Sequence, residues 1–71
     1  MIGATLQAGD KELCQVGAYG TATAGKKGEI QIRYWDEKTE RYRTVIGYIG
    51  EDGLEPDVPY KLNADRKFVR A

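Results

Sequence analysis

The residues of this sequence that are best suited to binding chemistry are basic and aromatic side chains of one predicted hairpin. Guanidinium groups and aromatic rings together can hold phosphates and stack on bases, which makes this set a candidate face for an anion or a nucleic acid. The alternative is a solvated face with cation–π contacts of about 0.5–1 kcal/mol each. Four acidic residues between positions 29 and 40 nearly neutralise the six bases between positions 26 and 50 and favour that alternative. The candidate residues are Arg33, Trp35, Arg41 and Arg43, with Lys26 and Lys27 in support.

The composition offers few residues that could catalyse a reaction. The chain contains no histidine, so a general base near neutral pH would need a carboxylate, lysine or tyrosine with a shifted pKa. Cys14 is the single cysteine, and it has neither a histidine to activate it nor a second thiol to bridge. One thiolate without histidine does not make a zinc site. We therefore expect no enzyme activity, no metal and no cofactor.

The length of the chain predicts a need for support from other copies. Seventy-one residues make one small domain, and a domain of this size buries only about 60% of its unfolded surface. With disulfides and metals excluded, oligomerisation is the remaining source of stability. The formal net charge of zero argues against a general polyanion binder. No apolar run is long enough for a membrane span, and a lone thiol without an export signal favours the cytoplasm.

An eight-residue repeat runs through the first half of the sequence. Cut from residue 3, the chain reads GATLQAGD, KELCQVGA, YGTATAGK and KGEIQIRY. The fourth column is Leu6, Cys14, Ala22 and Ile30, and the sixth is Ala8, Val16, Ala24 and Ile32. Between them lie Gln7, Gln15, Thr23 and Gln31, and the seventh column is Gly9, Gly17 and Gly25. The columns repeat the pattern of a short strand followed by a turn.

Strand geometry gives this repeat a structural meaning. Alternate side chains of a strand point to opposite faces, so columns four and six are predicted to face inward and the Gln/Thr column outward. The recurrent glycine permits a positive φ or a tight corner. Stacked units of this kind form a β-solenoid. The alternatives are a plain meander of short strands and, less favoured, a disordered segment.

The segment Ala18–Gly25, with sequence AYGTATAG, resembles the AGYGSTxTAG octapeptide of bacterial ice-nucleation proteins. It is still more similar to GTATAG-type repeats in bacterial and phage proteins of unknown function, whose arrays end in a segment like residues 28–69. The resemblance covers residues 18–69 and implies architecture and a bacterial, phage or mobile-element source. It does not imply ice nucleation, because that activity depends on long arrays and Thr21-x-Thr23 occurs once.

From position 28 to position 50 the sequence predicts strand, turn and strand. A five-residue loop from Asp36 to Glu40 is preferred to a four-residue loop. That register pairs Tyr34 with Tyr42, Ile32 with Thr44 and Ile30 with Ile46, and it places Trp35 opposite Arg41 and Arg33 opposite Arg43. Beyond Gly50, residues 60–62 and 67–69 predict a closing hairpin in which Leu62 and Phe68 belong to the core.

Together these patterns predict an all-β fold without substantial helix, in a single domain spanning residues 1–71. A short β-solenoid-like octad repeat over residues 3–34 runs into an antiparallel hairpin or meander over residues 28–70. We expect a non-enzymatic, self-associating structural or protein-interaction module, with nucleic-acid binding by the 28–50 hairpin as the alternative. Two coils are too few for a stable solenoid, so the N-terminal end is expected to pair with another copy, giving a dimer or a higher oligomer, or with an unidentified protein. The predicted association residues are Leu6, Ala8, Leu13, Cys14 and Val16.

Overall fold

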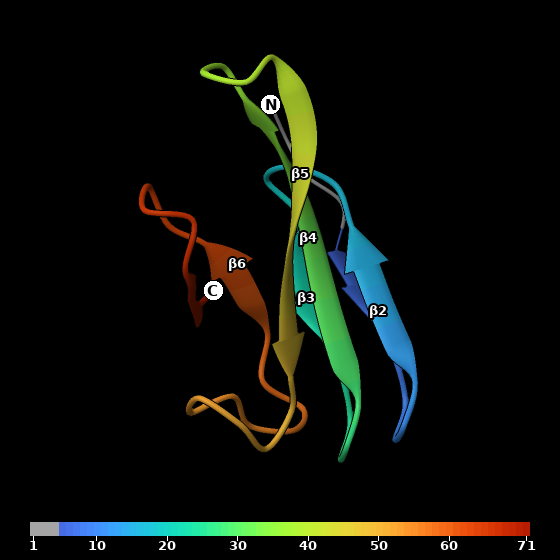
Figure 1. Ribbon diagram of the computed structural model, residues 1–71. Coiled ribbons are helices and arrows are strands. Elements are labelled where there is room, and N and C mark those ends of the chain that lie inside the picture. Colours follow the sequence, from blue (N-terminus) through green and yellow to red (C-terminus); the bar gives the residue numbers. More distant parts are fainter. Residues whose placement is uncertain (1–4) are drawn as a thin grey trace.

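The computed structural model describes residues 5–71, and its described part consists of strands and turns without helix (Figure 1). An all-β fold is thereby confirmed. Seven strands follow one another along the chain: β1 (Thr5–Gln7), β2 (Leu13–Val16), β3 (Thr21–Thr23), β4 (Glu29–Asp36), β5 (Arg41–Tyr48), β6 (Tyr60–Leu62) and β7 (Phe68–Arg70). Positions 3 and 4 of the first predicted octad lie outside the described residues.

The strands form two sheets, and the first four strands alternate between them. Sheet A has the order β1-β3-β6-β7, and sheet B has the order β2-β4-β5. The first four strands pair in parallel across a fixed sequence distance of 16 residues: Thr5 lies beside Thr21, and Cys14 beside Ile30. Two consecutive 16-residue segments therefore lie one on the other, each giving one strand to each sheet.

The corners between these strands repeat every eight residues. Backbone N–H groups of Glu12, Gly20 and Gly28 donate to the carbonyls of Gly9, Gly17 and Gly25 at 3.4, 3.0 and 3.1 Å. The sequence predicts a positive φ or a tight corner at each of these glycines, and the positive φ does not occur at the glycine. It occurs two positions later, at Lys11, Tyr19 and Lys27, with φ of 60, 64 and 57°.

Close approach explains the glycine at one of these corners. The Gly25 N–H donates to the Gly9 carbonyl at 3.3 Å, and a Cβ at Gly25 would lie 2.9 Å from the Gly9 carbonyl carbon. No side chain fits where the two corners stack.

The two inward columns of the repeat supply most of the core. Cys14, Ala22 and Ile30 of the fourth column are buried, and so are Val16, Ala24 and Ile32 of the sixth. The inward prediction is confirmed for these six residues. Leu6, at the outer end of the fourth column, is 49% exposed, and Thr23 of the supposed outer column is buried.

The predicted register of the β4–β5 hairpin is wrong. Asp36 pairs with Arg41, so the loop is the four residues 37–40, and Trp35 lies opposite Tyr42. The shift turns Val45, Gly47 and Ile49 toward the core and leaves Tyr42, Thr44, Ile46 and Tyr48 exposed. A one-residue change of register moves a whole set of side chains to the other face of a strand.

The predicted closing hairpin is confirmed. β6 and β7 pair antiparallel with Leu62 beside Phe68, and both side chains pack half-buried against the core. Tyr60 is buried at the start of β6, where it pairs with Ala22 of β3. The antiparallel strands therefore cover the second 16-residue segment on both sheets, β5 along β4 and β6 along β3.

Candidate association surfaces

In the part of the chain that the structure describes, the first 16-residue segment forms an open end. β1 is the outermost strand of sheet A and β2 is the outermost strand of sheet B. Among residues 5–71 no strand pairs with the outer edge of either one. Such edges carry backbone donors and acceptors that can pair with a strand of another chain.

The structure leaves some of the five predicted association residues exposed and buries the others. Leu6 is exposed on β1 at the open end, and Ala8 beyond it packs half-buried against the core. Cys14 and Val16 on β2 are buried, and the Cys14 thiol donates to the Leu6 carbonyl at 3.3 Å. Leu13 is 50% exposed, and because strand side chains alternate, it lies on the outer face of sheet B.

Part of the basic-aromatic cluster does come together. The rings of Trp35 and Tyr42 meet edge to face with centroids 5.0 Å apart. The guanidinium of Arg33 lies 4.2 Å from the centroid of the Tyr42 ring. These three side chains form a continuous stack on the outer face of sheet B, and Tyr42 is the member that the predicted register had placed in the core.

Arg41 and Arg43 lie on the opposite face of the hairpin, so the predicted pairs Trp35–Arg41 and Arg33–Arg43 are wrong. Nε of Arg43 forms an ion pair with Asp36 Oδ2 at 2.8 Å. Partial desolvation acts to raise the pKa of Asp36, but hydrogen bonds from Lys38 N–H, Thr39 and Arg43 together hold that pKa below its usual value. The ion pair with Asp36 therefore holds the Arg43 side chain at the hairpin turn.

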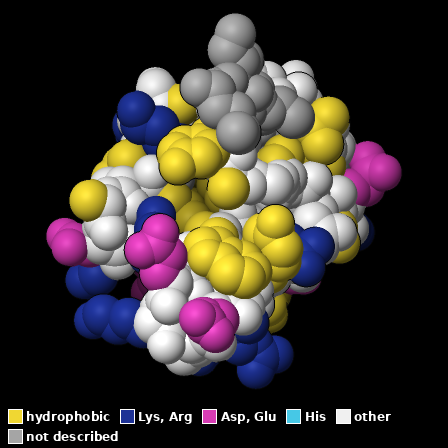
Figure 2. All heavy atoms as spheres, turned by 90° about the horizontal axis from the view of Figure 1, so that it is seen from above, with side chains coloured by type: hydrophobic (Ala, Val, Ile, Leu, Met, Phe, Trp, Pro, Cys, Tyr) yellow, Lys and Arg dark blue, Asp and Glu magenta, His cyan; other side chains and the backbone are white. Residues whose placement is uncertain are grey.

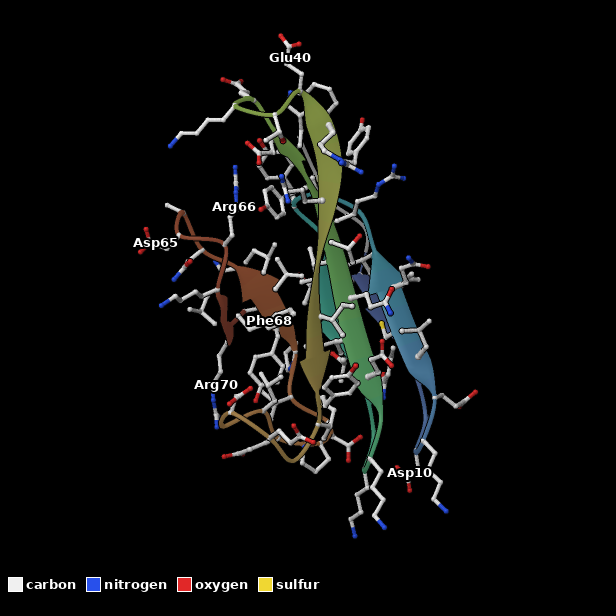
Figure 3. All side chains as sticks on the ribbon, in the orientation of Figure 1. Asp10, Glu40, Asp65, Arg66, Phe68 and Arg70 are labelled. Atoms are coloured by element: carbon white, nitrogen blue, oxygen red, sulfur yellow. The ribbon has the colours of Figure 1, made fainter. Side chains whose placement is uncertain are left out.

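Lys26 and Lys27 lie at the other end of β4 from Trp35. The Lys26 N–H donates to Asp10 Oδ1 at 2.9 Å, and Figure 3 shows Asp10 at the end of the molecule opposite to Glu40 of the hairpin turn. The six candidate anion-binding residues are thus distributed over two faces and two ends. Figure 2, which looks onto the molecule from above, shows basic and acidic side chains interspersed around hydrophobic ones.

A shallow groove separates the hairpin tip from the β6–β7 turn, and no pattern in the sequence predicts it. Its lining includes Tyr19, Lys38, Lys61 and Arg66. The Arg66 guanidinium lies 4.6 Å from the centroid of the Tyr34 ring. This contact joins the β6–β7 hairpin to the β4–β5 hairpin. Residues this distant in sequence come together only through the tertiary fold.

The described residues hold neither a metal-binding cluster nor a membrane-spanning helix. Over residues 5–71, histidine, cysteine and acidic side chains form no cluster of three that could hold a metal ion. The described strands and turns likewise include no helix long and apolar enough to cross a bilayer.

The known proteins found to be similar in sequence to this chain belong to one class. Ice nucleation proteins of Pseudomonas syringae and of Pseudomonas syringae pv. syringae are each 45% identical to the chain over 38 residues. That stretch is 54% of this chain, and the chain spans only 3% of the length of these curated relatives. No family model and no solved structure matches. The expected likeness to ice-nucleation proteins is thus confirmed over part of the chain, and it indicates a structural repeat module.

Proposed function

We propose that this chain is a non-enzymatic structural module, a two-coil β-solenoid capped at one end, which associates with another copy through its open end. The observation that carries the proposal is the pairing of strands across 16 residues in both sheets. It supports a solenoid, because successive coils of a solenoid pair in parallel at one repeat length.

Cross-coil hydrogen bonds support the same interpretation. Lys11 N–H donates to the Lys26 carbonyl at 2.9 Å, and Glu29 N–H donates to the Glu12 carbonyl at 3.0 Å. Each bond joins equivalent corners of the two coils. A third coil could be added to the open end by the same contacts, and in its place we propose a strand of a second molecule.

The cap determines the symmetry of this association. Head-to-tail stacking needs an open end of each polarity, but β5 and β6 already cover the second coil. β5 and β7 are edge strands as well, but neither belongs to the repeat, so the association that we propose joins two open ends head to head, with antiparallel edges related by a two-fold axis. Leu6 is central to this contact, because it is the exposed member of the inward column.

The test is the solution mass of the chain, by light scattering, over a wide range of concentrations. Wild type is expected to exceed the 7.9 kDa of one chain, and Leu6→Lys is expected to weaken the association, because an edge lysine blocks strand pairing. Tyr19→Lys is the matched control, since Tyr19 is a large exposed side chain outside β1 and β2. A wild-type monomer at high concentration would refute the proposal.

Nucleic-acid binding remains the second candidate, supported by the stack of Arg33, Tyr42 and Trp35. Bases can stack on aromatic platforms of this kind. The expected result is binding of a single-stranded oligonucleotide that weakens with salt and is lost in Trp35→Ala. Absence of binding at low salt removes this candidate.

A further inference from the structure

The outer face of sheet B collects most of the large exposed hydrophobic side chains of the described residues. Besides Leu6 and Tyr19, these are Leu13, Trp35, Tyr42, Ile46 and Tyr48. All five of the latter lie on β2, β4 or β5 at positions that alternate with core-facing residues. An apolar patch on one side of a small protein indicates an interaction surface, and aromatic residues are typical of protein interfaces.

Two charged side chains share this face, and they have opposite signs. Glu29 and Arg33 lie on β4, two positions before and two positions after Gln31. The Gln31 amide donates to the Glu29 carboxylate, which confirms that these neighbours share one side of the strand. The strand residues of the face therefore carry no net charge, which disfavours a polyanion and favours a protein partner.

The arrangement of these charges is self-complementary. A two-fold axis running across the strands at Gln31 and its neighbour Ile46 would lay β4 on the β4 of a second copy, in the opposite direction. Glu29 and Arg33 are each about 7 Å from Gln31 along the strand, so the axis brings Glu29 of one copy over Arg33 of the other, twice. Ile46 meets its own equivalent at the centre, and the sheets pack face to face about 10 Å apart.

We propose that the outer face of sheet B is a second self-association surface, on which another copy of this chain packs with two-fold symmetry. It is distinct from the open end, because Leu6 belongs to sheet A and the face belongs to sheet B. Two separate two-fold surfaces on one chain link copies into assemblies larger than a dimer.

A charge exchange tests the face independently of the open end. In a Leu6→Lys background, which removes the first contact, the chain is expected to remain a dimer through the face. Glu29→Arg and Arg33→Glu should each raise the dimer dissociation constant about tenfold or more, because each places like charges together. The double variant Glu29→Arg/Arg33→Glu restores opposite charges. Its dimer dissociation constant should return to near that of the Leu6→Lys chain.

The matched control is Glu37→Arg with Arg41→Glu, a charge exchange at the hairpin tip outside the face. Circular dichroism and thermal melting of every variant establish that the fold is retained. A monomer in the Leu6→Lys background overturns the second surface while leaving the open end intact as a proposal. A double variant no better than the single ones overturns the two-fold arrangement, and oligonucleotide binding by the face with a monomeric chain assigns the face to nucleic acid instead.

Discussion

Gly47 lies directly opposite Ile30 in the β4–β5 ladder, and the space over the glycine is filled by side chains from two later segments. A Cβ at Gly47 would lie 2.6 Å from Leu54 Cδ1 and 2.8 Å from Phe68 Cε2. Because both neighbours belong to or pack against the core, Gly47→Ala is expected to lower the free energy of unfolding by about 1–3 kcal/mol through overpacking. Urea denaturation at matched protein concentration measures this loss.

Gly17→Ala is the control for the Gly47 prediction. A Cβ at Gly17 would meet nothing within 4 Å, and its φ is outside the left-handed region. This change should be neutral or stabilising by up to about 1 kcal/mol, because alanine restricts the unfolded chain. Equal effects of the two substitutions would contradict the packing of Phe68 over Gly47.

The left-handed backbone at Lys27 predicts that glycine is the better residue there. Lys27 has a φ of 57°, a conformation that costs a side-chain-bearing residue about 1–2 kcal/mol. Lys27→Gly should therefore raise the free energy of unfolding by up to about 1 kcal/mol. Lys26→Gly removes the same charge at a neighbouring residue without positive φ and should be destabilising. Thermal melts that rank the two variants in the opposite order would disprove the corner geometry.

Asp36 predicts a stability that depends on pH. Its pKa is lowered in the folded chain, so the stabilisation is complete above the pKa of the unfolded chain and is lost as pH falls through the folded pKa. Asp36→Asn keeps an oxygen for the Lys38 N–H but has no charge for Arg43. Wild type should therefore be more stable than Asp36→Asn at pH 6, and the difference in stability should shrink as the pH falls below the usual carboxyl pKa. A difference that stays constant across this range would contradict the prediction.

The repeat half was the part of the fold that the sequence predicted best. Small and aliphatic residues recur at an eight-residue spacing in it, and burial of Cys14, Ala22 and Ile30 follows from that spacing. The spacing did not predict the left-handed residues. Glycine at the seventh column predicts a positive φ or a tight corner, yet Lys11 and Tyr19 adopt the positive φ. Close packing of stacked corners explains the glycine at Gly25.

The hairpin shows why alternation alone was insufficient. Side chains along β5 alternate between two faces, and the five-residue loop is predicted because it pairs Tyr42 and Ile46 with Tyr34 and Ile30. The structure buries Gly47 instead, since Phe68 and Leu54 occupy the room that its missing side chain leaves. Phe68 comes from the last strand, a distant part of the sequence. The same register error placed Arg41 and Arg43 beside Trp35 and Arg33, whereas the structure puts them on the opposite face of the hairpin, so the candidate binding face was only partly predicted.

Cys14 should react slowly with a thiol reagent in the folded chain. Its side chain is buried and its thiol donates to the Leu6 carbonyl, so alkylation by iodoacetamide requires local opening. A cost of opening near 3 kcal/mol slows the reaction about a hundredfold relative to the chain in urea. As a control, Gln15→Cys in a Cys14→Ala chain places the thiol at an exposed position of the same strand. Similar rates for both thiols would show that the fourth column does not face inward.

The hydroxyl of Tyr60 fastens the loop between β5 and β6. The Glu55 N–H donates to Tyr60 Oη at 2.7 Å, and the ring is buried beside β3. Tyr60→Phe preserves the ring but leaves that N–H without its partner, which should cost about 1–2 kcal/mol of unfolding free energy and speed hydrogen exchange at the Glu55 amide. Tyr48→Phe removes a hydroxyl from an exposed ring and should change stability by less than about 0.5 kcal/mol. Unchanged exchange at Glu55 in the Tyr60 variant would mean that the loop is held by its backbone turn alone, the Leu54 N–H donating to the Glu51 carbonyl at 2.9 Å.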